Sequence, residues 1–168
     1  MRMWPLVTSN RILSEGNPAM PTDALLAYLH FIAIIGTVSF LVVEAVLCRP
    51  GLGSELAHRL KRVDAAYASF AVLALVTGLL RLFWGAKGSA FYTPNPVFHA
   101  KMTVYVAVAL LSILPTVRFI GWSKAALATG RGPDDAAVHA VRRFIVAELV
   151  LVALLPLLAT LMARGVGR

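Results

Sequence analysis

The sequence predicts an all-α fold, an integral membrane four-helix bundle. Of the 168 residues, 59% are hydrophobic and only 14% are charged, whereas soluble domains average about 45–50% apolar and about 25% charged residues. Four apolar runs each reach the ~20 residues that a helix needs to cross a bilayer. Because these runs use most of the chain, we expect one domain over residues 24–168, preceded by an N-terminal tail over residues 1–23.

The expected boundaries follow from where each apolar run starts and stops. We expect Asp23 to cap the first span and the Arg-Pro-Gly sequence at residues 49–51 to end it. Asn95 should be the N-cap of the third helix, with Pro96 at its first position, where the missing N–H needs no partner. The Pro-Asp-Asp sequence at residues 133–135 should begin the last helix. The predicted spans cover residues 24–48, 64–84, 97–120 and 144–163.

The net charge of +8 is concentrated in two of the three connections between spans. Residues 49–63 hold four Lys or Arg and residues 118–143 hold five, whereas residues 85–95 hold one. The positive-inside rule therefore predicts a bacterial inner-membrane protein with both termini on the periplasmic side. Basic residues placed beside membrane spans indicate the lipid bilayer as partner, so we exclude nucleic acid.

The single cysteine, Cys48, limits the chemistry that sulfur can supply. One thiol forms neither an internal disulfide nor a cysteine-based metal cluster within one chain. Its position at the end of the first span, beside Arg49, favours the role of a small apolar residue. The sequence also contains no CxxCH haem-attachment, HExxH zinc or P-loop phosphate pattern.

Two layers of polar residues emerge when positions on different spans are compared by depth, at 1.5 Å per residue. Each residue of the outer layer is expected roughly 9–12 Å outward of its span midpoint. Helical spacing places each on the face of its span that carries the other small or polar residues. Ionisable residues within spans are costly and are candidate functional residues by default. The outer layer comprises His30, Arg81, Lys101 and Met162.

This outer layer suits a metal tetrapyrrole such as haem. His30 would bind the metal, and Arg81 and Lys101 would hold the propionates near the aqueous edge. The second axial ligand would be Met162, Lys101 or no protein group. Alternatively, His30 is hydrogen-bonded within the bundle while the two cations extend outward to water. Copper binding by His30 and methionines is disfavoured, because Met102 lies on another helix face.

The other histidines do not join this layer. His99 lies two residues from Lys101, about 200° around the helix, and is therefore expected at the lipid interface. His58 and His139 fall in basic connections, where we expect them to be solvated.

The inner layer consists of Glu44, Arg118 and Glu148. We expect Arg118 to form structural ion pairs with the two carboxylates and so to join helices at the cytoplasmic edge. The alternative is a proton-related role, since buried carboxyl groups mark proton pathways in membrane proteins.

Three segments resemble a family of small four-span bacterial inner-membrane proteins with no established activity. These segments are AYLHFIAI, VTGLLRLFWGAKGSAFYTPNPVFHAKM and SILPTVRFIGW. The resemblance extends from Thr22 to Gly165 and implies the four-span topology.

Two shorter segments, YLHFIAI and FHAKM, resemble the haem-containing membrane protoporphyrinogen oxidase family. In that family, a histidine of an early helix and a lysine in a WLHAKL-like segment are important for function. The resemblance implies that His30 and Lys101 are the corresponding residues.

The sequence as a whole favours an inner-membrane protein with an outward-side tetrapyrrole or redox site centred on His30. The alternative is an accessory or scaffold subunit, within a larger membrane complex or a homo-oligomer, with no chemistry of its own. A small transporter is less favoured, because the chain lacks the broken helices expected at a midplane site. The sequence gives no physical reason to classify the protein as an enzyme.

Overall fold

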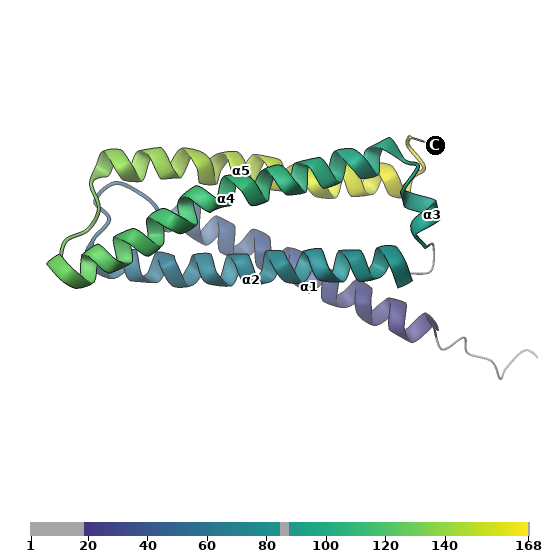
Figure 1. Cartoon of the computed structure of the whole chain (residues 1–168), viewed down its shortest axis with the longest axis horizontal. Coiled ribbons are helices and arrows are strands. Elements are labelled where there is room, and N and C mark those ends of the chain that lie inside the picture. Colours follow the sequence, from purple (N-terminus) through teal and green to yellow (C-terminus); the bar gives the residue numbers. More distant parts are fainter. Residues whose placement is uncertain (1–18, 85–87, 168) are drawn as a thin grey trace, which may run out of the picture.

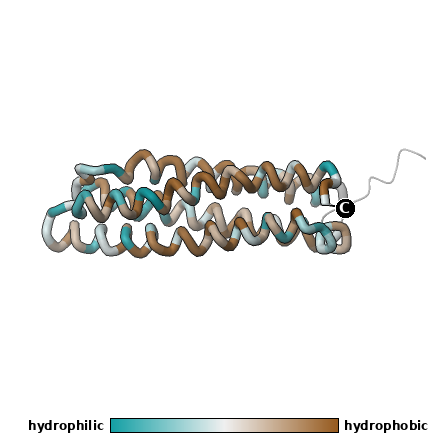
Figure 2. Tube along the Cα trace, turned by 90° about the horizontal axis from the view of Figure 1, so that it is seen from above, coloured by the Kyte–Doolittle hydropathy of each residue, from teal (hydrophilic) through white to brown (hydrophobic). Residues whose placement is uncertain are grey.

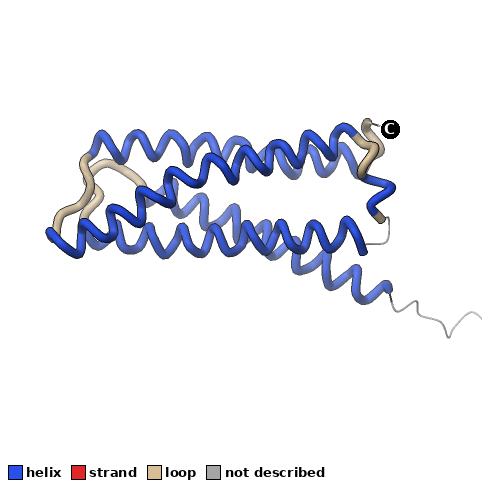
Figure 3. The backbone as a smooth tube through the Cα atoms, in the orientation of Figure 1, coloured by secondary structure: helices blue, strands red, loops and turns tan. Residues whose placement is uncertain are grey.

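The computed structural model of the protein describes residues 19–84 and 88–167. These residues are 87% helical and contain no strand (Figure 3), which confirms the all-α prediction. The long helices alternate in direction, so the α1–α2 and α4–α5 connections lie at one end of the bundle (the loop end), and α3 lies at the other (the α3 end; Figure 1). The helices of this part of the chain are α1 (Ala19–Leu47), α2 (Ser54–Trp84), α3 (Ser89–Tyr92), α4 (Pro96–Thr129) and α5 (Asp135–Ala163).

The four long helices are each long and apolar enough to cross a membrane. Within the most apolar stretch of each helix, only 11–22% of the residues are buried inside the protein. Many of the others face outward; the exposed fractions of Phe31 and Leu110 are 62% and 64%. Figure 2 shows hydrophobic residues along the middle of the helices. Lipid is the environment in which such a surface is stable, so the protein is an integral membrane bundle.

Three of the long helices extend beyond the predicted spans at the loop end. α2 begins at Ser54, α4 continues to Thr129 and α5 begins at Asp135. The predicted boundaries followed hydropathy, which changes where a helix leaves the hydrocarbon. Helix propensity does not change there, because the Ala, Leu, Lys and Arg residues of these segments are strong helix formers.

The N-terminal boundary also differs from the prediction. α1 begins at Ala19, so Asp23 lies inside the helix and is not its N-cap. Proline is tolerated in the first turn of a helix, which explains how α1 includes Pro21. Residues 19–23 of the predicted tail therefore belong to α1, and residues 1–18 lie outside the described residues.

The structure confirms two predicted helix starts. Asn95 caps α4 by accepting a hydrogen bond from the Val97 N–H at 2.8 Å, with Pro96 at the first helical position. α5 begins at Asp135, within the predicted Pro-Asp-Asp sequence. The Gly51 N–H donates to Asp135 Oδ1 at 2.7 Å, which fixes the α1–α2 connection to the start of α5.

The packed core is concentrated in the loop-end half of the bundle. Leu41, Leu60, Phe119 and Ile145, one from each long helix, are fully buried there. α1 packs mainly against α2, and α4 mainly against α5, whereas α1 and α5 meet over a shorter stretch. Toward the α3 end, α1 therefore depends on α2 for its position.

Gly36 permits the close approach of α1 to α2. A Cβ atom at Gly36 would overlap the ring of Phe70, and that ring stacks on Phe40 with the centroids 5.5 Å apart. Small residues at such positions let membrane helices pack closely.

Replacing Gly36 with alanine should push α1 away from α2. We expect the free energy of unfolding in detergent to fall by about 1–3 kcal/mol, as in other overpacked cores. Chemical denaturation followed by circular dichroism measures this change. Gly121→Ala is the matched control, because a Cβ atom at Gly121 meets no atom within 4 Å. Equal destabilisation by the two substitutions would contradict the packing role of Gly36.

Candidate functional site

Three of the four outer-layer residues come together toward the α3 end of the bundle. His30 on α1, Arg81 on α2 and Lys101 on α4 are each half-buried. The charges of Lys101 and Arg81 act on the His30 ring and on each other, so the three side chains share one electrostatic environment. Met162 on α5 is also half-buried, but no interaction among the described residues joins it to these three.

The hydrogen bond between His30 and Thr77 sets which imidazole nitrogen is free. His30 Nδ1 lies 2.9 Å from Thr77 Oγ1, and the Thr77 hydroxyl donates its only proton to the Leu73 carbonyl at 2.7 Å. Thr77 must therefore accept a hydrogen bond from the His30 Nδ1–H. In the neutral imidazole, the other nitrogen, Nε2, then keeps its lone pair.

The absence of a side chain at Gly78 lets the His30 ring lie against α2. A Cβ atom at Gly78 would lie 3.1 Å from His30 Cε1, closer than ordinary van der Waals contact. Gly78 directly follows Thr77, so α2 supplies both the partner of the ring and the space that the ring occupies.

The two cations of this cluster lack a counter-ion within the described residues. Arg81 Nε is buried without a hydrogen-bond partner. The one ion pair found in this part of the chain joins Arg59 to Glu55 at the loop end. The cluster therefore combines a histidine acceptor nitrogen with two cations, a combination that attracts an anionic group.

The remaining histidines differ from one another in their surroundings. His99 is exposed, as predicted, and its Nε2 donates to the Thr93 carbonyl at 2.8 Å. His139 is exposed as well. The prediction of a solvated His58 is wrong: this residue is half-buried, and its Nδ1 lies 2.7 Å from Ser123 Oγ. The helical extensions of α2 and α4 bring these two residues together.

The inner layer contains a third carboxyl group that the sequence comparison by depth did not include. Glu44 and Glu148 are 1% exposed and Asp64 is 4% exposed. Tyr67 donates its hydroxyl to Glu148 Oε2 at 3.1 Å, and Thr116 donates to Asp64 Oδ1 at 2.8 Å. Asp64 is the first residue of the predicted second span, and the sequence already indicates that it faces inward, although the predicted inner layer did not include it. Its helical spacing with Tyr67 is the signal that places it on the inward face.

The predicted ion pairs of Arg118 with Glu44 and Glu148 are absent from the described residues, and Arg118 is exposed. The buried face of α4 contains Phe119. Neighbouring residues on a helix point about 100° apart, so Arg118, directly before Phe119, points away from this face. Arg118 therefore faces outward. Oε1 of Glu44 and Oε1 of Glu148 lack hydrogen-bond partners in the described part of the chain.

A different arginine, Arg142 on α5, acts at the level of the inner layer. Its guanidinium donates to the carbonyl oxygens of Ala45 and, at 2.9 Å, Cys48. The last carbonyls of a helix have no partner within it, and a cation near them is favourable. Arg142 thus fixes the end of α1 to α5. Cys48 itself is buried with its thiol 4.0 Å from the Val138 carbonyl oxygen, as expected for a small apolar residue.

Comparison with known proteins identifies one family. The model of the family described as "Predicted membrane protein (DUF2214)" matches residues 22–167. The chain belongs to the DUF2214 family. This confirms the expected membership of a membrane-protein family without an established activity. No curated protein and no solved structure matches the chain, so the resemblance to the haem-containing oxidase family stays a prediction.

Two of the residues that organise this DUF2214 protein were not singled out from its sequence. Thr77 lies one turn before Arg81 on α2, a spacing that could have placed it on the same face. Arg142 stands in a basic segment with no local sign of its target, because the carbonyls of Ala45 and Cys48 are nearly a hundred residues away in the chain.

The loss of Arg142 should destabilise the bundle, whereas the loss of Arg118 should not. In detergent without added lipid, we expect Arg142→Gln to lower the free energy of unfolding by about 1–3 kcal/mol, the usual cost of removing a hydrogen-bonded charge. Arg118→Gln should leave that energy nearly unchanged. Thermal unfolding of both variants tests this difference, and a larger loss for Arg118→Gln would restore the ion-pair hypothesis.

Proposed function

We propose that this DUF2214 protein binds a metal tetrapyrrole with carboxylate side chains, such as haem, at His30, Arg81 and Lys101. The observation that carries the proposal is the Nε2 lone pair of His30 beside two half-buried cations that have no acidic partner among the described residues. Neutral imidazole is a metal ligand, and planar or ammonium cations bind carboxylates. The cluster therefore offers a nitrogen for the metal of the ligand and two cations for its carboxylates.

Each residue of the cluster has a defined part in this proposal. Nε2 of His30 would bind the metal, while Thr77 holds the ring by the bond to Nδ1, as partners of metal-bound histidines generally do. Arg81 would donate its Nε–H, and Lys101 its ammonium, to the propionates. Gly78 leaves room for the imidazole against α2. A bound haem would supply one-electron redox chemistry. Met162 is left out, because no hydrogen bond or electrostatic interaction among the described residues joins it to the cluster.

The visible absorption spectrum tests this assignment directly. After expression with ample haem and purification in mild detergent, we expect a Soret band that is lost in His30→Ala and weakened in Thr77→Val. His99→Ala is the matched control and should keep the band, because that side chain is exposed and bonded to the Thr93 carbonyl in the turn before α4. A colourless, folded wild-type protein would refute the proposal.

A second candidate is an accessory or scaffold subunit of a larger membrane complex or homo-oligomer. The observation that favours it is the apolar face of α1 formed by Tyr28, Phe31 and Ile35, which are 61%, 62% and 59% exposed. These residues are spaced to share one side of the helix, and another transmembrane helix could pack on them. Co-purification of stoichiometric subunits, or a defined oligomer in native mass spectrometry, would support this role over a redox site.

We also propose that the α3 end faces the periplasm of a bacterial inner membrane, with both termini on that side. The support is the concentration of Lys and Arg at the loop end, as the positive-inside rule requires of cytoplasmic connections. An alkaline phosphatase fusion after residue 167 should be active, whereas a fusion at Gly130 should be inactive. The reverse pattern of activity would show that the α3 end faces the cytoplasm. It would not bear on the structure of the cluster.

A further inference from the structure

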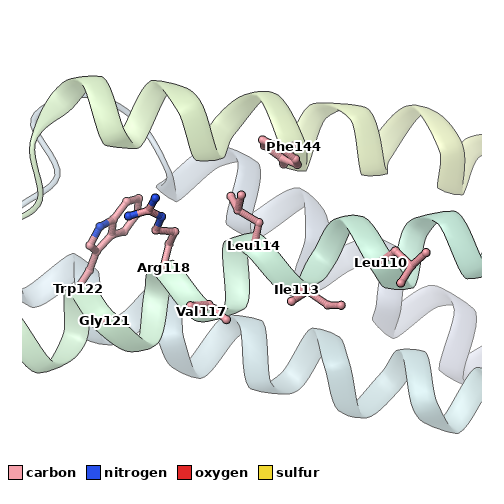
Figure 4. A pocket seen from close by; sticks show the side chains of 8 residues that line it. All are labelled: Leu110, Ile113, Leu114, Val117, Arg118, Gly121, Trp122 and Phe144. Carbon is pink, nitrogen blue, oxygen red and sulfur yellow. The ribbon is translucent and has the colours of Figure 1, made fainter.

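A groove runs along the outer side of α4, next to α5, in the loop-end half of the bundle. Its volume is about 740 Å³. Leu110, Ile113 and Val117 line one wall, and Phe144 of α5 lies across from them (Figure 4). The three aliphatic residues are 64%, 55% and 61% exposed. This groove therefore opens toward the hydrocarbon and offers an apolar track parallel to α4.

One end of the groove is polar. Arg118 and Trp122 line this end, one helical turn apart on α4, and Figure 4 shows both side chains there, away from Leu110. Arg118 is exposed and has no ion pair among the described residues. An unpaired guanidinium within a transmembrane helix is costly unless it reaches the interface or an anionic group.

The depth of Arg118 matches the level of lipid headgroups. Arg118 lies about 15 Å along the helix from Val108, the middle of the predicted third span. Half of a typical hydrocarbon core is also about 15 Å thick. The guanidinium thus lies at the boundary of the hydrocarbon, and Leu110 to Val117 lie at the depth of acyl chains. Tryptophan is enriched at this same boundary.

We propose that the groove is a binding site for one phospholipid with an anionic headgroup. The guanidinium of Arg118 donates to the phosphate in a charge-assisted pair, and an acyl chain lies along Leu110, Ile113 and Val117. Basic sites between helices at the cytoplasmic side of a membrane bind such headgroups. Arg143, next to the groove residue Phe144, is exposed at the same end of the bundle, and its charge favours an anionic headgroup over a zwitterionic one.

A second copy of the chain fits the groove less well. Its loop end carries the same excess of basic residues, so a parallel neighbour would place further positive charge near Arg118. A phosphate instead supplies the counter-ion that the described part of the protein lacks. Charge complementarity therefore selects the lipid as the occupant.

Native mass spectrometry of the delipidated protein, titrated with phosphatidylglycerol or phosphatidylcholine, tests the site. We expect one phosphatidylglycerol to bind at lower concentration than phosphatidylcholine. Arg118→Gln should weaken the binding of phosphatidylglycerol about tenfold, which corresponds to the loss of one charge-assisted hydrogen bond. Lys124→Gln is the matched control: this exposed basic residue lies on the same helix outside the groove, and its loss should leave the tight site unchanged.

A second variant fills the groove without removing the charge. A Cβ atom at Gly121, which lines the polar end of the groove, meets no atom within 4 Å, so Gly121→Leu should fold normally and block the space for the headgroup. We expect it to lose the tight site while retaining wild-type thermal stability in detergent. Unchanged lipid binding in both Arg118→Gln and Gly121→Leu, or equal binding of the two lipids, would overturn the proposal. So would a protein dimer that Gly121→Leu dissociates, because the occupant would then be a second copy.

Discussion

The burial of carboxyl groups between helices is the constraint on which the rest of this bundle depends. Glu44, Asp64 and Glu148 come from three different helices, and Thr116 connects the fourth through its hydrogen bond to Asp64. In hydrocarbon, a polar group without a protein partner costs several kcal/mol. The helices must therefore stay together at this level, with apolar side chains such as Phe119 closing the surrounding core.

This constraint gives the two ends of the bundle different properties. At the loop end, Arg142 joins the end of α1 to α5, and the α1–α2 connection is bonded to the start of α5. Toward the α3 end, α1 relies on α2, and His30, Arg81 and Lys101 are half-buried rather than enclosed. A ligand site is more readily accommodated where packing is less complete. The cluster around His30 lies in this more open half, separate from the buried carboxyl groups.

The sequence located candidate residues by depth and helix face better than it located their partners. His30, Arg81 and Lys101 were placed in one layer, and the structure brings them together, because depth is set by rise per residue and face by helical period. Which residues pair across helices depends on how each helix is rotated about its axis and on which helices are neighbours. Neither the rise per residue nor the helical period contains this information. The sequence therefore paired the inner carboxyls with Arg118, although that side chain faces lipid and Arg142 is the cation bonded to α1.

The sequence by itself determined that the chain is a four-span membrane protein, since long apolar runs have no other stable environment. It also determined local features such as the Asn95 cap, which depends on residues two positions apart. Only the tertiary structure decided which nitrogen of His30 is free, that three carboxyls share the inner layer, and that Arg118 lies in a lipid-facing groove. These features join residues far apart in the chain, and their energies depend on how the helices are rotated against one another.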